Sequence, residues 1–280
     1  MTQSKRRVNT VIFIFLTILA LLFFVPIAFV VLNSFKSKLF ISDNPFSLPV
    51  GELFVGFQNY IDGIEKTNFI SAFGYSLFIT VTSVVTIIIF TSMTAWYITR
   101  VKSKFTNFCY YAFIFAMVVP FQMIMFTMSK WADMLSLNNP LGIVVLYLGF
   151  GSSMSVFMFS GFVKSIPLEI EEAGRIDGAS PLGIFAKIVF PIMKPITVTI
   201  GVLNAMFIWN DYLLPYLVIG LSTKYKTIPV VVQYLKGTYG NVDYGAFMAL
   251  LVLSIIPIVI FYGICQKHII NGVISGAVKG

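Results

Sequence analysis

Residues 164–193 read KSIPLEIEEAGRIDGASPLGIFAKIVFPIM, and this polar stretch lies between two apolar runs that are each long enough to cross a bilayer. Charge gathers here in a chain that is otherwise poor in it, on Glu169, Glu171, Glu172, Arg175, Asp177 and Lys187. A polar, helix-forming segment between two spans is typical of a loop that contacts another molecule. We therefore predict that the segment 164–194 is a contact site.

The composition of the whole chain predicts an all-α membrane protein. Of 280 residues, 58% are hydrophobic and 11% are charged, whereas a soluble domain carries about 25% charged residues. The net charge of +8 comes from Lys and Arg at the ends of the apolar runs, where such residues set membrane topology. This placement disfavours a nucleic-acid partner.

The apolar runs predict one domain over residues 1–280 with six transmembrane helices, at about 9–33, 69–99, 106–129, 141–163, 195–220 and 245–266. Residues 36–68 are predicted to be an external loop with short elements, and residues 267–280 a C-terminal tail. The second span is rich in Thr and Ser, whose hydroxyls can bond to their own backbone. We expect that span to be buried within the helix bundle.

The distribution of basic residues predicts the orientation. Six spans put both termini on one side, and 12 of the 19 Lys and Arg residues fall on that side. Basic residues favour the cytoplasm, so both termini and the segment 164–194 are predicted to be cytoplasmic. Cys109 and Cys265 then lie near the reducing cytoplasmic face and are interpreted as packing residues.

The segment 164–194 is predicted to form a helix, a turn and a second helix. Pro167 suits the first turn of a helix, and the acidic residues that follow favour its dipole. Glu171 and Arg175 are spaced to pair across one turn. Asp177-Gly178 breaks the helix, and Ser180-Pro181 then resembles an N-cap followed by proline at the first position.

Two small residues, Ala173 and Gly174, leave a bare patch on the first of these helices. Another backbone or side chain could approach such a patch closely. A solvated loop that merely connects two spans would explain neither this patch nor the doubled helix break.

At these residues the chain resembles the permease subunits of ATP-binding cassette (ABC) importers, specifically the carbohydrate group related to the maltose permeases. The family's Glu-Ala-Ala loop, continuing into Gly and a spaced Ile and Pro, is matched by residues 172–179 (EAGRIDGA) and 188–191 (IVFP). The resemblance continues through 209–211 (WND), 226–229 (KTIP) and 272–280 (GVISGAVKG). Gly174 departs from the family pattern, which usually has a second Ala there.

The resemblance implies a type I ABC importer permease fold in which this loop is a coupling helix that docks on a cytoplasmic ATPase. The coupling residues would be Glu169, Glu172, Ala173, Gly174, Asp177 and Gly178, with Glu172 as the anchoring charge. The tail would also contact the ATPases, through Gly276, Ala277, Val278 and Lys279. The external stretch 221–244 would reach toward the extracellular solute-binding protein.

The implied assembly contains a second permease subunit, two ATPase subunits, the solute-binding protein and the sugar, in a bacterial plasma (inner) membrane. The chain lacks the Gly-x-x-x-x-Gly-Lys-Ser/Thr phosphate loop, so ATP and Mg would bind to the partner ATPase. No catalytic constellation is visible, and the single histidine, His268, makes no metal-ligand cluster with the two cysteines. We therefore predict a transporter subunit without a cofactor or metal of its own.

Polar residues within the apolar runs are candidates for the translocation pathway. Asp211 is the acidic residue well inside a run, and an ionisable group there is a functional candidate. Its neighbours offer an aromatic face and amides, as a sugar site requires, and the full set is Gln122, Asn204, Trp209, Asn210 and Asp211. The alternative, weighed equally, is that Asp211 bonds to a partner helix and has a structural role.

The predicted function is import of a di- or oligosaccharide by alternating access, powered by the separate ATPase. An ABC permease for a polyol or a glycerol-phosphate-type solute is the first alternative, although no Arg or Lys lies within the spans to bind a phosphate. An ion-coupled secondary transporter is the second alternative, and it would need more ionisable groups within the membrane than this chain offers. A membrane enzyme is less favoured still.

Overall fold

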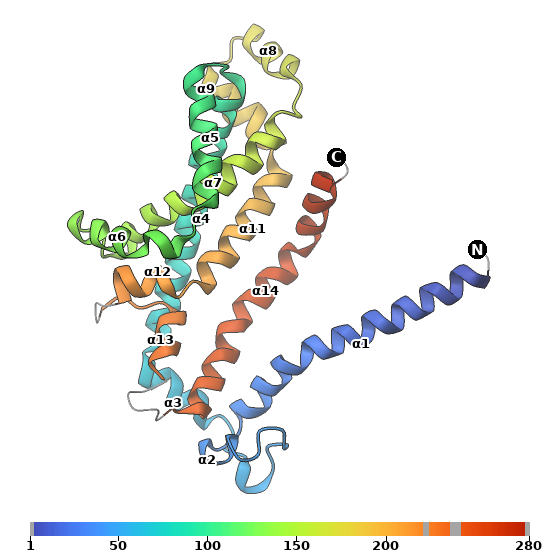
Figure 1. Ribbon diagram of the computed structural model, residues 1–280, viewed down its shortest axis with the longest axis vertical. Helices are drawn as coiled ribbons and strands as arrows, with labels where there is room; N and C mark the ends of the chain where they lie inside the picture. Colours follow the sequence, from blue (N-terminus) through green and yellow to red (C-terminus); the bar gives the residue numbers. More distant parts are fainter. Residues whose placement is uncertain (1–2, 221–223, 236–241, 278–280) are drawn as a thin grey trace. The chain divides into compact units, whose positions relative to one another are not determined.

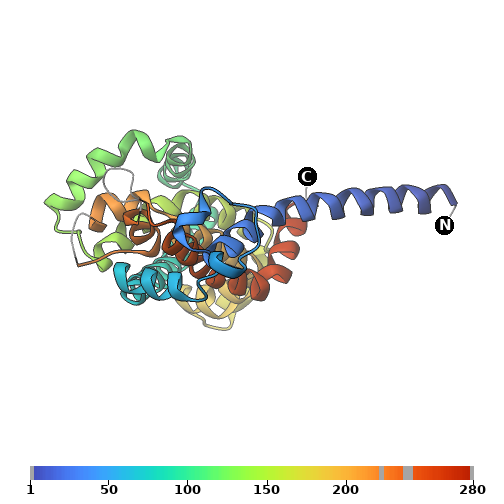
Figure 2. The ribbon, with the colours of Figure 1, turned by 90° about the horizontal axis from the view of Figure 1, so that it is seen from below.

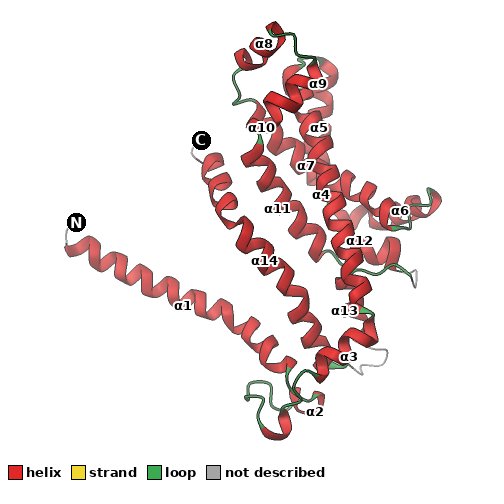
Figure 3. Cartoon of the chain, turned by 180° about the vertical axis from the view of Figure 1, so that it is seen from behind, coloured by secondary structure: helices red, strands yellow, loops and turns green. Residues whose placement is uncertain are grey.

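The computed structural model describes residues 3–220, 224–235 and 242–277. Within these ranges the regular structure is helical and no strand occurs (Figure 3); one isolated antiparallel bridge joins Lys36 to Phe54. The long helices are α1 (Gln3–Ser34), α4 (Phe69–Arg100), α7 (Pro140–Val163) and α14 (Tyr244–Ala277). Each contains a stretch long and apolar enough to cross a membrane, and α1 and α14 run without a break through Pro26 and Pro257 (Figures 1 and 2). The all-α prediction is confirmed.

Two further spans are possible only if each of two bent helix pairs counts as one. One pair is α5 (Lys104–Val118) with α6 (Phe121–Met134), and the other joins residues 181–192 to α11 (Lys194–Asn210). By length and composition, the described chain therefore has four helices that could each cross a membrane unbroken, or up to six spans if each bent pair counts as one.

The third predicted span, 106–129, is not one continuous helix. It breaks at Val119-Pro120, where the axes of α5 and α6 differ by 106° (Figure 1). The ring of Pro120 disfavours helical backbone in the residue before it, and Val119 is extended, with φ −75° and ψ 114°. The 15 residues of α5 reach about 22 Å, which is short of the roughly 30 Å hydrocarbon core.

The fifth predicted span, 195–220, also differs from the structure. Helix α11 ends at Asn210, and the chain continues through the short α12 (Leu213–Pro215) into a π-helix, η3 (Tyr216–Gly220). Pro215 lacks the backbone donor that an unbroken α-helix would need at this point. Hydropathy did not reveal the break because the residues on both sides of it are apolar.

The residues of the chain group into two compact units. One comprises Met1–Ile70 and Val231–Pro257, and the other comprises Ser71–Val230 and Ile258–Gly280. The first unit contains the short elements α2 (Lys38–Ile41), η1 (Gly51–Leu53) and α3 (Gln58–Thr67) of the predicted external loop. Its loop is tied to its C-terminal part by an ion pair of 2.7 Å between Lys66 Nζ and Asp243 Oδ2.

This ion pair shifts the pKa of both partners. The hydrogen bond from Lys66 to Asp243 raises the pKa of Lys66. Burial acts to raise the pKa of Asp243, but the hydrogen bonds from Lys66 and from the Ala246 backbone outweigh it and hold that pKa below its usual value. Both groups therefore remain charged at neutral pH.

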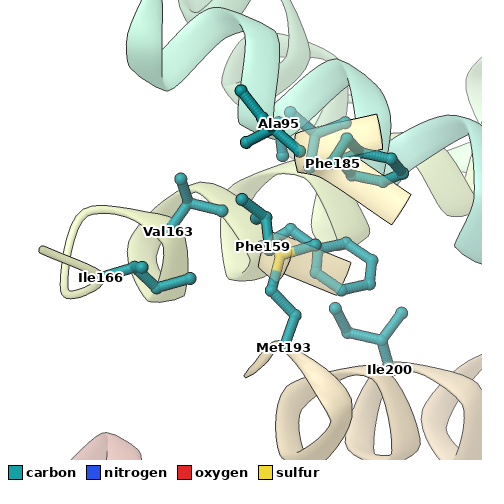
Figure 4. Close-up of a cluster of buried hydrophobic side chains, with 10 residues drawn as sticks. Ala95, Phe159, Val163, Ile166, Phe185, Met193 and Ile200 are labelled. Carbon is teal, nitrogen blue, oxygen red and sulfur yellow. The ribbon is translucent and has the colours of Figure 1, made fainter. Parts of the chain in front are cut away.

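The second unit has a hydrophobic cluster beneath the segment 164–194. It joins α4, α7, the π-helix η2 (Phe185–Val189) and α11 (Figure 4). Its buried members are Ala95, Val156, Phe159, Val163, Ile166, Ile184, Phe185, Val189, Met193 and Ile200. The predicted contact segment is thus attached to a packed core that includes residues of α4, α7 and α11.

Candidate functional site

The segment 164–194 folds locally as its sequence predicts. Helix α8 (Leu168–Ile176) follows Pro167 and ends at Asp177, and Gly178 then adopts a φ of +80°, a left-handed conformation that favours glycine. Helix α9 (Pro181–Ile184) begins after Ser180, whose hydroxyl accepts a hydrogen bond from Gly183 N at 3.2 Å. The helix, turn and N-cap predictions are confirmed. Figure 1 shows helices α8 and α9 of this segment.

The second helix of the segment continues as a π-helix. Phe190 N–H donates to Phe185 O, five residues back, at the end of η2. Pro191 follows and cannot donate a backbone hydrogen bond, and α10 (Phe190–Ile192) ends at Met193. The chain then turns by 78° into α11.

Glu171 is the buried anchor of α8, with a side chain that is 1% exposed. Its Oε1 accepts a hydrogen bond from Arg100 Nε at 2.8 Å and lies 2.7 Å from Arg100 Nη2. Its Oε2 accepts a hydrogen bond from Trp96 Nε1 at 3.0 Å. Arg100 Nη2 also donates to Ile166 O at 2.9 Å, so one guanidinium connects the end of α4 to the residues on both sides of Pro167.

The predicted pairing of Glu171 with Arg175 is therefore wrong. Arg175 is exposed, whereas Glu171 faces α4 and pairs with a residue 71 positions earlier in the chain. The i,i+4 spacing indicated a local partner, but Arg100, which contacts Oε1 through two nitrogens, and Trp96, which donates to Oε2, together satisfy the carboxylate more fully. Sequence reasoning missed this site; its signal was Trp96 and Arg100, one turn apart at the end of an apolar run.

Gly174 faces the chain's own core rather than a free patch. A Cβ on Gly174 would lie 2.6 Å from Ile188 Cδ1 and 3.5 Å from Ile184 Cγ1, which shows how closely α8 approaches η2. The sequence correctly indicated that a small residue at position 174 allows a close approach. The approach is made by Ile188 of the same chain, however, and not by a partner protein. Ala173, beside it, is exposed.

The outward surface of α8 carries the other predicted contact residues. Glu169, Glu172 and Ala173 are exposed, as are Asp177 and Gly178 at the turn. Ile176 also lies there and is 86% exposed, a large apolar side chain among charged neighbours. We define the outward surface of α8 as Glu169, Glu172, Ala173, Ile176, Asp177 and Gly178.

Asp211 has a structural environment. Its Oδ2 accepts a hydrogen bond from Tyr147 OH of α7 at 3.0 Å, and its Oδ1 accepts from Leu213 N at 2.9 Å. Tyr147 is 1% exposed. The carboxylate thus caps α12 and satisfies a buried phenol, which is the partner-helix role weighed in the sequence.

The other four candidate pathway residues make contacts with different parts of the structure. Asn204 Nδ2 donates to Ser155 Oγ of α7 at 3.1 Å, and the Trp209 ring packs edge-on against Phe73 with centroids 5.9 Å apart. Asn210 is exposed and its amide bonds to the carbonyl of Met206 in its own helix. Gln122 is exposed on α6. Two of the five, Asn204 and Asp211, thus bond to the same helix, α7.

Two further predicted contact regions are described only in part. Val278 and Lys279 lie outside the described residues, and Gly276 and Ala277 end α14. In the stretch 221–244, residues 221–223 and 236–241 lie outside the description, and the middle forms α13 (Ile228–Tyr234). Ile228 and Val230 are buried, so this part is a packed helix and not an open loop. Among the described residues, no three His, Cys, Asp or Glu side chains gather as metal ligands would.

Comparison with known proteins identifies the family. A family model described as "Binding-protein-dependent transport system inner membrane component" matches residues 87–275. The chain is 39% identical to the "Probable starch degradation products transport system permease protein" of Thermoanaerobacterium thermosulfurigenes, with 94% of each chain covered. It is 35% identical to the "Multiple sugar-binding transport system permease protein" of Streptococcus mutans, over 95% of this chain and 96% of that protein.

A solved structure agrees in fold. The chain superposes with a TM-score of 0.78 on a chain from the crystal structure of a bacterial ABC transporter involved in the import of the acidic polysaccharide alginate. The match covers 95% of this chain and 98% of the other at 24% identity. With the family match over residues 87–275, the chain belongs to the inner membrane components of binding-protein-dependent transport systems, the permeases of ABC importers.

Proposed function

We propose that this permease subunit imports a di- or oligosaccharide across a bacterial inner membrane by alternating access, driven by ATP on a separate ATPase. The substrate class is supported by the relatives, which are named for starch degradation products, multiple sugars, and melibiose, raffinose and stachyose. The partners would be a second permease subunit, two ATPase subunits and an extracellular solute-binding protein. Both termini and α8 would face the cytoplasm.

The observation that carries the proposal is the two-sided character of α8. Its inner face is fixed to the permease through Glu171 and Gly174, while its outward surface is left for another protein. A partner that holds the outward surface would thereby move α4 through the Glu171–Arg100 pair. It would also move η2 and α11 through the contact of Gly174 with Ile188.

These two attachments suggest how motion of the ATPase would reach the spans. A buried, hydrogen-bonded ion pair resists separation because each charge would be left without a partner in a poorly solvated site. A close-packed contact at a glycine transmits displacement because packed side chains have little free volume. The segment 164–194 therefore moves as a rigid unit with the helices to which it is attached. ATP and Mg bind to the partner ATPase and not to this chain.

The test of function is uptake by the assembled importer in proteoliposomes. ATP enclosed in the proteoliposomes, with the solute-binding protein outside them, should drive accumulation of a labelled oligosaccharide chosen from a panel. An imposed proton or sodium gradient without ATP should drive none. Accumulation driven by such a gradient alone would identify an ion-coupled transporter, and accumulation of a polyol or glycerol phosphate in place of sugars would identify the other alternative.

Glu172→Lys is expected to weaken association with the ATPase and reduce transport at least tenfold while the permease still inserts and folds. The exposed carboxylate lies on the outward surface of α8, so reversing its charge replaces attraction by repulsion without disturbing the core. Copurification of the ATPase and initial uptake rates measure the effect. Glu65→Lys, an equally exposed reversal on α3, is the control; equal ATPase recovery from both variants would contradict the assignment.

Asp211→Ala is expected to destabilise the permease by roughly 1–3 kcal/mol, because the buried Tyr147 hydroxyl and the start of α12 lose their acceptor. Asp211→Asn retains an acceptor for the cap and should unfold near the wild-type temperature. Thermal unfolding in detergent measures both. Asn210→Ala, which removes an exposed amide next to it, is the matched control, and equal stability of the two alanine variants would exclude the structural role.

A further inference from the structure

Two hydroxyl groups near the ends of α4 and α7 are buried without a hydrogen-bond partner, Thr99 Oγ1 and Ser160 Oγ. Ser160 is 1% exposed. Other threonines of α4 behave differently: Thr91 and Thr94 donate to the carbonyl four residues back at 2.6 and 2.7 Å. Buried polar groups are nearly always satisfied, so these two hydroxyls require an explanation.

Both residues line one pocket of about 290 Å³ formed by the ends of α4, α5 and α7. The complete lining is Ile98, Thr99, Lys102, Asn107, Tyr110, Ser160 and Lys164. Lys164 Nζ lies 5.1 Å from the centre of the Tyr110 ring, which turns this ammonium group toward α5. The pocket therefore offers hydroxyl, amide and ammonium donors and contains no carboxylate in its lining.

The charged residues in the pocket lining are both basic, Lys102 and Lys164, and no acidic residue of the lining balances them. The buried carboxylate of helix α8, Glu171, is already paired with Arg100. Within the described residues, the ion pairs involve neither Lys102 nor Lys164. Two ammonium groups and two unpartnered hydroxyls in the lining of one pocket favour a ligand with several anionic oxygens, such as a phosphate group.

An exposed aromatic stripe lies on the same helix as part of the lining. Phe108, Tyr111 and Phe115 of α5 follow each other at helical spacing and are exposed, while Asn107 and Tyr110 line the pocket. Because the pocket lies where three apolar helices end, a phosphate bound there would be at headgroup depth. An acyl chain attached to that phosphate could then run along the aromatic stripe.

We propose that this pocket binds the phosphate of an anionic phospholipid of the cytoplasmic leaflet. Lys102 and Lys164 neutralise the charge, Thr99, Ser160 and Asn107 donate hydrogen bonds, and the aromatic stripe of α5 contacts an acyl chain. Basic pockets between transmembrane helices on the cytoplasmic side suit such headgroups. The inference rests on the proposed orientation of the permease, which places this end of the helices in the cytoplasm.

Lipid retention on the purified, assembled importer tests the inference, with phosphatidylglycerol as the probe and phosphatidylcholine as the neutral comparison. Native mass spectrometry should show phosphatidylglycerol bound to the wild type and about 25-fold weaker binding to Lys102→Gln/Lys164→Gln, since each lysine contributes about fivefold. Lys104→Gln, an exposed lysine outside the lining, should bind as the wild type does. Thr99→Val, which removes a hydroxyl at constant charge and shape, should also weaken binding.

Equal retention by all four proteins would overturn the proposal. Millimolar inorganic phosphate and phosphatidylglycerol are also compared by the rise in unfolding temperature that each produces. An equal rise with both would show that the pocket binds free phosphate and not a lipid headgroup. Copurification of a protein on the aromatic stripe, with no lipid retained, would assign that surface to a protein partner instead. Because retention is measured without transport, its failure is distinct from a failure of ATP-driven sugar uptake.

Discussion

Glu171→Ala is expected to abolish sugar import and to destabilise the permease by about 3–5 kcal/mol, the usual effect of removing one partner of a buried ion pair. The variant leaves the Arg100 guanidinium, whose side chain is 16% exposed, without its carboxylate. It also leaves the indole N–H of Trp96 without an acceptor. Helix α8 would then lose its ion pair and hydrogen bonds to α4, so that force applied to it would reach α4 less directly.

The measurements are thermal unfolding in detergent, copurification of the ATPase, and ATP hydrolysis with and without the binding protein. We expect a lower unfolding temperature and, in protein that remains folded, ATP hydrolysis that no longer produces uptake. Glu172→Ala is the matched control, because its carboxylate is the next one along and is exposed. Glu172→Ala should retain wild-type stability. Equal unfolding temperatures of the Glu171→Ala and Glu172→Ala variants would contradict the role of Glu171 as the buried anchor of α8.

A double-mutant cycle separates the pair from the general effect of each residue. Glu171→Gln and Arg100→Gln remove the charges and keep side chains of similar size. If the pair acts as a unit, the double variant should be much closer to either single variant than to the sum of both. Additive effects would mean that Glu171 and Arg100 stabilise the permease independently.

Gly174→Val is the second change with a large expected effect. The first added carbon would lie 2.6 Å from Ile188 Cδ1, and valine adds two methyl groups beyond it. Overpacking of this kind destabilises by about 1–3 kcal/mol, and α8 would have to move away from η2. We expect a lower unfolding temperature and loss of transport even where the ATPase still binds.

Three companion variants make this prediction specific. Gly174→Ala should be tolerated, because only the terminal methyl of Ile188 must shift and alanine favours the helix by up to about 1 kcal/mol. Adding Ile188→Val to Gly174→Val removes that methyl and should restore part of the stability. Ala173→Val, on the exposed side of the same helix, should leave stability unchanged and weaken the ATPase contact. A stable, transport-competent Gly174→Val variant would show that this close approach does not matter.

The order of helices and turns in the contact segment could be predicted from residues alone because each signal is local. Gly178 supplies the left-handed turn, Ser180 supplies the cap, and Pro181 suits the first position of the next helix. Long apolar runs likewise predicted α1, α4, α7 and α14, because the requirement to satisfy every backbone hydrogen bond in lipid leaves little choice but a helix.

The breaks in two predicted spans could be predicted only in part from the sequence. Pro120 is visible in the sequence, but a proline can also lie inside a continuous membrane helix, as Pro26 and Pro257 do. At Val119-Pro120 the helix axes instead differ by 106°. Hydropathy does not distinguish these outcomes, because the residues on both sides of each proline are apolar.

The sequence by itself therefore determined the helical class, the family and the local shape of the contact segment. Only the tertiary structure decided which way its side chains face. Glu171 has a charge of the right sign at the right spacing for Arg175, yet it pairs with Arg100, and Gly174 faces Ile188 rather than a partner. Both outcomes depend on residues distant in sequence that reach the same place by packing, and spacing along one helix carries no information about them.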